Sequence, residues 1–193
     1  LSSDQISAIG TDQVASLGTA QIQSLSTTAV KSLSNLQLSA MGTDQIKALT
    51  AVQVKSLTSD QINSLTASNL QALDASDVAA INSPVISNIS ASQFANLSST
   101  QLQVLTNAQL RALTTAQLDN LSTDQVASLT TGEIGVLTST QIGSLSTDKI
   151  ATLSSTQIQS IQTSAIASIT TDQLAAMSTS QLKALTATQV KSM

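Results

Sequence analysis

The stretch Ser122-Thr-Asp-Gln-Val-Ala-Ser-Leu129 holds the unit from which the whole sequence is built. After Leu1, units of eight residues follow one another without insertion or deletion as far as Met193, which makes 24 octads. We number the positions of each octad one to eight, so that position one falls on Ser2 in the first octad. A repeat this regular predicts a quasi-one-dimensional array rather than ordinary globular domains.

The start of each octad carries the signals of a helix N-terminus. Position one is Ser or Thr in 18 octads, and position four is Gln in 17. Such a hydroxyl accepts from the backbone N–H three residues later, and the Gln reaches back to the N–H of the cap residue, which forms a capping box. Charges agree with the helix dipole, since ten of the 11 acidic residues lie at positions one to four and six of the seven basic residues at position six. The exceptions are Asp119 and Lys149.

Positions five and eight are apolar in every octad, with Ile, Val, Leu or Phe at the first and Leu, Ile or Met at the second. Three residues apart, they are neighbours on one face of a helix. One long helix would carry these positions around its axis, because eight residues are not a whole number of turns. The sequence therefore predicts an all-α solenoid, a superhelical coil of about 24 very short capped helices. A β-solenoid, which the Ser, Thr, Ile and Val content suits, is the alternative.

The octads leave no residues for loops, so the chain must turn a sharp corner between helices. We expect positions five and eight to face the axis of the coil, positions two, three and six to face outwards, and roughly three or four helices to form each turn. Position seven is mostly Ser or Ala, which allows neighbouring helices to approach closely. The region Thr66–Leu97 is the least regular, because position four becomes Asn69, Asp77 and Val85 in succession.

Domain organisation follows from the same regularity. We expect residues 1–193 to form a single continuous octapeptide-repeat array. Neither end carries a polar capping repeat of the kind that arrays use for solubility, and Leu1 and Met193 are both core-type residues at position eight. The segment is therefore expected to be a fragment of a longer array, and end-to-end self-association of copies is an expected contact.

Composition excludes several classes of function. Charged residues make up only 9% of the chain, and the net charge of −4 is spread evenly, so we expect no nucleic-acid partner. No apolar run approaches the ~20 residues that span a bilayer, so membrane insertion is not expected. Histidine and cysteine are absent, which removes the common zinc, thiol and Ser–His chemistries. We predict no enzyme activity, no cofactor, and no catalytic, cofactor-binding or metal-binding residue.

Two patterns of reactive side chains have structural explanations. The Ser-x-x-Lys spacing of serine acyl-transferases occurs at Ser146–Lys149 and Ser180–Lys183, but the companion motifs are missing. Asp74 and Asp77 form the only close carboxylate pair within one octad. Since a calcium site needs about six oxygen ligands or more, we interpret them as a cap and its capping-box partner.

The pattern Thr-x-x-Gln-(Ile/Val/Leu)-x-x-Leu, seen in Thr114-Thr-Ala-Gln-Leu-Asp-Asn-Leu121 and Thr170-Thr-Asp-Gln-Leu-Ala-Ala-Met177, resembles the octapeptide repeat arrays of very large bacterial secreted or cell-surface adhesin-like proteins. The resemblance covers the whole chain. It implies a non-enzymatic structural segment, an extracellular stalk, spacer or adhesin-like rod whose export signal lies outside this segment. The alternative is a recognition scaffold that binds a protein, a glycan or an ordered surface through its Ser/Thr-lined exterior.

Overall fold

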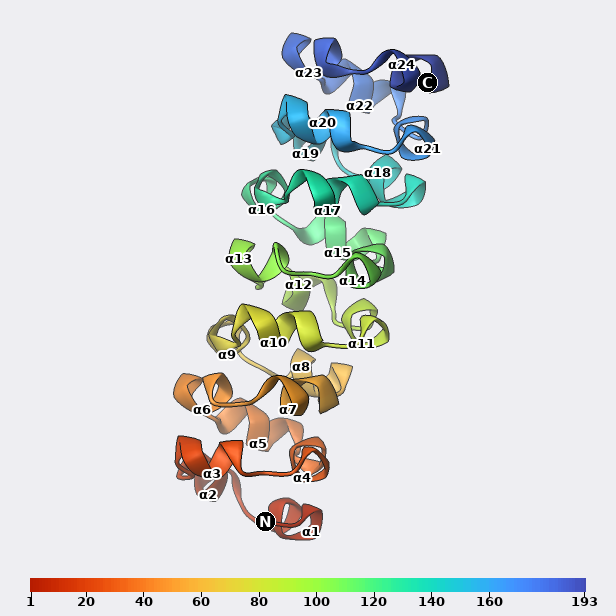
Figure 1. The fold of residues 1–193 in the computed structure, drawn as a ribbon. Coiled ribbons are helices and arrows are strands. Elements are labelled where there is room, and N and C mark those ends of the chain that lie inside the picture. Colours follow the sequence, from red (N-terminus) through yellow and green to blue (C-terminus); the bar gives the residue numbers. More distant parts are fainter. The chain divides into compact units, whose positions relative to one another are not determined.

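The computed structural model describes all of residues 1–193, and its only regular secondary structure is α-helix. Every octad contains one helix of four to six residues, and no β-strand is present. Figure 1 shows these short helices joined directly by tight corners. The predicted solenoid of 24 short helices is confirmed, and the β-solenoid alternative is wrong.

The helices group into two compact units, Leu1–Val104 and Leu105–Met193. The first unit contains α1 (Ser3–Ala8), α2 (Thr11–Ala15), α3 (Thr19–Gln23), α4 (Thr27–Ser32), α5 (Asn35–Ala40), α6 (Thr43–Lys47), α7 (Ala51–Ser56), α8 (Ser59–Asn63), α9 (Ala67–Ala72), α10 (Ala75–Ala80), α11 (Ser83–Ser87), α12 (Ala91–Phe94) and α13 (Ser99–Leu102). The second contains α14 (Asn107–Ala112), α15 (Thr115–Asn120), α16 (Thr123–Ser128), α17 (Thr131–Val136), α18 (Ser139–Ser144), α19 (Thr147–Thr152), α20 (Ser155–Ser160), α21 (Thr163–Ile166), α22 (Thr171–Ala176), α23 (Thr179–Ala184) and α24 (Ala187–Ser192). That the octads form a single continuous array stays a prediction.

The capping box is the local reason why helices as short as these begin where they do. At α16 the hydroxyl of Ser122 accepts from the Gln125 backbone N–H at 3.1 Å, and Gln125 Oε1 accepts from the Ser122 N–H at 2.8 Å. Where position one is glycine, as at Gly10, the Gln side chain still accepts from the glycine N–H at 2.8 Å, although no hydroxyl is available. An octad with a capping box therefore supplies partners for its own first backbone donors, whereas α10, α11 and α21 have no side-chain capping hydrogen bond.

Two extended residues turn the corner between successive helices. Before α16, Leu121 has φ −61° and ψ 145°, and the cap residue Ser122 has φ −69° and ψ 161°. The N–H of Leu121 donates to Leu118 O at 3.3 Å and closes the last turn of the preceding helix. No residue in the chain has a positive φ. The corners therefore need no glycine.

Within each unit the chain returns over itself after between three and four helices. Helices three places apart pack together, as α1 does with α4, α7 with α10, and α19 with α22, and Figure 1 shows α4 lying directly beyond α1. Side-chain hydrogen bonds join octads four places apart, for example Gln37 to Ile6. Both spacings agree with the expected three or four helices per turn.

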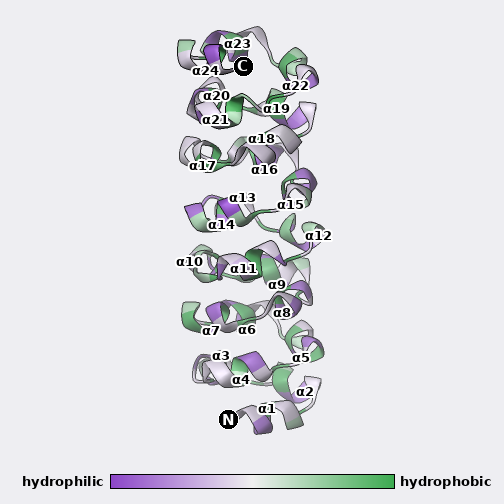
Figure 2. Cartoon of the chain, turned by 90° about the vertical axis from the view of Figure 1, so that its right-hand side faces the viewer, coloured by the Kyte–Doolittle hydropathy of each residue, from purple (hydrophilic) through white to green (hydrophobic).

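The core consists of positions five and eight, as predicted. Position five is buried in the first 21 octads, where Phe94, the only aromatic residue, is completely buried. It becomes partly exposed only in the last three octads, and Val190 is 56% exposed. Position five is therefore covered by octads that follow it in the sequence. Figure 2 shows that green hydrophobic and purple hydrophilic segments recur along the short helices.

The expected outward orientation of position six is wrong for two octads. A Cβ atom added at Gly135 would lie 3.0 Å from the carbonyl oxygen of Ser160, and one added at Gly143 would lie 3.0 Å from that of Ser168. Both carbonyls belong to position seven of the octad three places later, where one helix rests on another. The absence of a side chain at Gly135 and Gly143 permits this close approach.

Candidate functional site

The recurring polar feature of the interior is the side-chain amide at position four. Gln53 Nε2 donates to the carbonyl oxygens of Ile22 and Leu25, both at 2.8 Å, while its Oε1 accepts from the cap N–H of Thr50 at 2.8 Å. Ile22 and Leu25 occupy positions five and eight of the octad four places earlier. We call this pair of bonds from Nε2 the amide bridge.

The amide bridge recurs with the same atoms in both units. Its donors are the glutamines at positions 37, 45, 53, 61, 93, 101, 141, 173, 181 and 189. These side chains are buried, and Gln53 is only 2% exposed. Because a buried amide must have partners, nine of these glutamines connect the cap of their own helix to the backbone of an earlier octad. The exception is Gln93, whose Oε1 accepts from Asn96 Nδ2 at 3.1 Å instead of from its cap N–H.

Sequence reasoning assigned these glutamines only to the capping box and missed the bridge. A signal was available. A capping box accepts Glu as readily as Gln, yet position four is Gln in 17 octads and Glu only at Glu133. Only the amide combines an acceptor for the cap N–H with a donor for two carbonyls. The near-absence of Glu therefore indicated a required donor at this position.

Shorter or charged residues at position four replace the bridge in different ways. Asn69 reaches only the carbonyl of Met41, at 2.9 Å. Lys149 donates to the main-chain oxygen of Asp119 and forms an ion pair with Oδ1 of the same residue at 3.2 Å. Asp119 and Lys149 are the two residues that break the charge pattern of the octads. The structure therefore explains them together, because the exposed carboxylate neutralises a lysine that is only 8% exposed.

Glu133 and Asp77 place carboxylates at position four, and an ionised carboxylate cannot donate a hydrogen bond to the carbonyl oxygens of an earlier octad. Glu133 Oε2 accepts from the Thr130 N–H at 2.6 Å, but its buried Oε1 has no hydrogen-bond partner. Asp77 is only 5% exposed. Burial raises the pKa of Asp77 above its ordinary value of 3.8, the neighbouring charge of Asp74 raises it further, and a backbone hydrogen bond at Asp74 opposes both effects.

Asp74 occupies the N-cap position of α10, as expected, but the capping box predicted for Asp74 and Asp77 is wrong. The Asp74 side chain makes no capping hydrogen bond, and the Asp77 N–H donates instead to the Asp74 main-chain oxygen at 2.9 Å. Ser146 does cap its helix, because its hydroxyl accepts from the Lys149 N–H at 3.4 Å, while the Lys149 ammonium bonds to Asp119. No group of three or more Asp and Glu side chains is placed to hold a metal ion. No helix is both long enough and apolar enough to cross a membrane.

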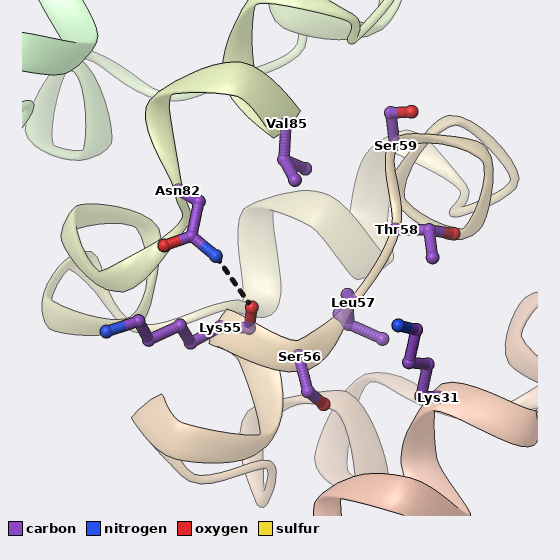
Figure 3. A pocket seen from close by; sticks show the side chains of 8 residues that line it. All are labelled: Lys31, Lys55, Ser56, Leu57, Thr58, Ser59, Asn82 and Val85. Carbon is purple, nitrogen blue, oxygen red and sulfur yellow. Dashed lines mark hydrogen bonds between the residues drawn. The ribbon is translucent and has the colours of Figure 1, made fainter.

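A pocket of about 380 Å³ opens where the amide bridge is missing at Val85. Its lining comes from the ends of α4 and α7, the start of α8 and the start of α11, as Figure 3 shows. The lining residues are Lys31, Lys55, Ser56, Leu57, Thr58, Ser59, Asn82 and Val85. Asn82 caps nothing with its side chain, and its Nδ2 donates instead to the Lys55 carbonyl at 3.4 Å.

Comparison with known protein families finds one repeat. Residues 14–51, 30–67 and 101–131, together less than half of the chain, are similar to the ALTTAQ repeat. The letters of that repeat occur in the chain as Ala112–Gln117, which are positions seven, eight and one to four of the octad register. No curated protein and no solved structure matches the chain. The repeat match and the purely helical repeat fold indicate a structural rather than a catalytic protein.

Proposed function

We propose that this chain is a spacer, a non-enzymatic stalk segment of a large secreted or cell-surface bacterial protein. The observation that carries the proposal is the amide bridge, which recurs with the same atoms at ten glutamines, six in the first unit and four in the second, and each time joins octads four places apart. Octads held by identical contacts are interchangeable, so their number can set a distance. The resemblance of the octad pattern to arrays in adhesin-like proteins supports the cellular setting.

The spacer role is tested by lengthening one unit. The chain has no cysteine, so Asp124→Cys and Asp172→Cys, both at exposed position three, introduce two unique spin-label sites in the second unit. One, two or three blocks of three octads are then inserted between the labels. We expect the label-to-label distance, measured by pulsed electron spin resonance, to increase by the same amount for each block. Unchanged or irregular distances would contradict the spacer role.

A matched control uses inserted blocks whose position-four glutamines are all replaced by methionine. Methionine has nearly the size of glutamine but cannot donate to the two carbonyls. We expect these blocks to give broad distance distributions, because the bonds that join octads four places apart are gone. Equally narrow distributions from both kinds of block would show that the amide bridge does not fix the spacing.

Two further measurements address the cellular role. In the parent protein, the exposed residues at positions two and three are exchanged between octads while positions one, four, five and eight are kept. A spacer retains function after this exchange, whereas a recognition surface loses it. Antibody labelling of intact cells tests the location, since octads inside the cell would remain unlabelled.

A further inference from the structure

The first three octads carry the amide donors of the bridge at position four, but within the chain no octad lies four places before them. Oε1 of Gln5, Gln13 and Gln21 accepts from the cap N–H of its own helix at 2.7 or 2.8 Å, as in the interior. All three side chains are exposed, and no Nε2 among them donates a hydrogen bond within the chain. Ile9 and Leu17 at position eight are also partly exposed. We call this surface of α1, α2 and α3 the donor end.

The last octads have the opposite deficit, because their carbonyl oxygens at positions five and eight receive no amide. The main-chain oxygens without a side-chain donor are those of Ile166, Ile169, Leu174, Met177, Leu182 and Leu185. Position five also loses its apolar cover, since Leu182 is 42% exposed and Val190 is 56% exposed, whereas this position is buried in the first 21 octads. Figure 1 shows α22, α23 and α24 in the last layer of the second unit. We call the surface of α21, α22, α23 and α24 the acceptor end.

The two ends follow from the direction of the amide bridge, which always runs from an octad to the one four places earlier. An array of any number of these octads therefore has free amide donors over its first octads and free carbonyl oxygens over its last ones. Each end is complementary to the other end and not to itself, since two donor ends or two acceptor ends would leave their polar groups without partners. A contact between two different surfaces is heterologous and can add copies one after another.

We propose that the donor end of one copy docks on the acceptor end of a second copy of this chain and continues its array. The interior sets the register of this junction. Gln189, in the last octad, donates to Ile158 O at 3.0 Å and to Ile161 O at 2.9 Å. An octad placed after it reaches the carbonyls eight residues further on, so Gln5 of the added copy donates to Ile166 O and Ile169 O. This inference does not depend on the spacer role.

The next two octads of the added copy repeat this pairing. Gln13 donates to Leu174 O and Met177 O, and Gln21 donates to Leu182 O and Leu185 O. Position four of the fourth octad is Ala29, which has no donor, so the junction contains three amide bridges. The added octads also cover the exposed side chains of Leu182 and Val190, as later octads cover position five elsewhere. Leu1 and Met193 both belong to position eight and compete for one place, so one of them turns into solvent.

Sedimentation equilibrium of the full chain at increasing concentration tests the junction. We expect the mean mass to rise with concentration, because each added copy presents a new acceptor end. A donor-end variant carries Gln5→Glu, Gln13→Glu and Gln21→Glu, which keep an acceptor for each cap N–H but remove the three donors. Its self-association should be weaker by about tenfold or more. A parent chain that stays monomeric up to about 1 mM would overturn the proposal.

A matched control separates the loss of donors from the added negative charge. Ser68→Glu, Ala108→Glu and Ala116→Glu add the same charge at exposed position three, in octads that belong to neither end. This control should associate as the parent does. Equal weakening by the control and the donor-end variant would show that association follows net charge and not the amide bridge.

A mixing experiment tests the polarity of the contact. An acceptor-end variant carries Leu182→Glu and Val190→Glu, which place charges on the exposed apolar side chains of that end. Circular dichroism checks that it stays helical, and Val190→Ser is the milder substitute. Each variant alone should be monomeric, whereas an equal mixture of the donor-end and acceptor-end variants should form dimers and nothing larger, because it retains one intact end of each kind. A mixture of helical variants that stays monomeric, or parent-like association of either variant alone, would overturn the donor-to-acceptor junction.

Discussion

Octads five to eight, residues 34–65, and octads nine to eleven, residues 66–89, lie side by side in sequence but differ at position four. The first group has four glutamines and four amide bridges. The second has Asn69, Asp77 and Val85, of which only Asn69 donates a hydrogen bond to an earlier octad. Both groups nevertheless form one helix per octad with positions five and eight buried. Helix formation and the apolar core therefore do not depend on the amide bridge, which adds a separate connection between distant octads.

The largest loss of stability is expected when a glutamine of the first group is replaced by a residue that cannot form the amide bridge, as in the second group. Gln53→Met keeps the side-chain volume but removes the bonds to Ile22 O, Leu25 O and the Thr50 N–H. We expect a loss of about 3 kcal/mol, because buried main-chain groups are left without partners. Native-state hydrogen exchange of the first unit measures it. The control Gln23→Met changes an exposed side chain and should stay within about 0.5 kcal/mol of the parent. An equal change in the two variants would show that the bridge contributes no stability.

Glu133 allows the reverse substitution, in which a missing donor is added at position four. Glu133→Gln replaces an unpartnered buried oxygen by a donor, so it should stabilise the second unit by about 2 kcal/mol. Urea unfolding followed by circular dichroism measures the change. Asp124→Asn, which removes an equal charge from an exposed site, separates the effect of the donor from that of net charge. A gain of the same size in Asp124→Asn would contradict the assignment to the bridge.

The role of Asp77 in the second group can be tested through the pH dependence of the free energy of unfolding. Its folded-state pKa is raised by burial and by Asp74, so the folded chain binds this proton more strongly than the unfolded chain does. The resulting contribution to stability is complete below pH 3.8 and is lost as pH rises through the folded-state pKa. Asp77→Asn should therefore stabilise the chain by about 1 kcal/mol at pH 7, as a neutral donor like Asn69. The difference from the parent should shrink as pH falls toward 3.8. Thermal unfolding across this range, with exposed Asp60→Asn as control, tests it, and a pH-independent difference would contradict the raised pKa.

The smallest effect concerns the hydroxyl caps, which Thr50 provides in the first group and Thr66 in the second, whereas Asp74 and Asn82 form none. Thr50→Gly should cost only a few tenths of a kcal/mol, because glycine adopts the cap conformation and keeps its N–H for Gln53, whereas Thr50→Ala should cost about 1 kcal/mol. The natural octads that begin with Gly10, Gly18 and Gly42 show that the helix forms without the hydroxyl. Melting temperatures of the two variants give the comparison. If glycine were as costly as alanine, the side-chain hydroxyl would be the only important part of the cap.

Much of the fold could be predicted because its signals are local. The hydroxyl at Ser122 and the amide at Gln125 lie three residues apart and cap the same helix, so the octad alone contains both partners. The apolar residues at positions five and eight likewise lie on one helix face. The capping box of Asp74 and Asp77 was predicted wrongly because the residue types favour it, whereas burial of Asp77 and its repulsion by Asp74 depend on the folded structure. The pocket at Val85 could not be found, since its lining residues come from four octads.

The amino-acid sequence by itself determined where each helix begins and ends, and which two side chains of every octad are buried, because those features depend on residues within eight positions of one another. Only the tertiary structure decided which octads meet. The spacing of 28 to 31 residues between a glutamine amide and its two carbonyls follows from the angle of each corner, summed over four octads. Small differences in backbone angle at each corner decide which octads meet after four corners, and no single residue type determines that outcome. The same summed geometry brought Lys149 to Asp119 and opened the pocket beside Val85.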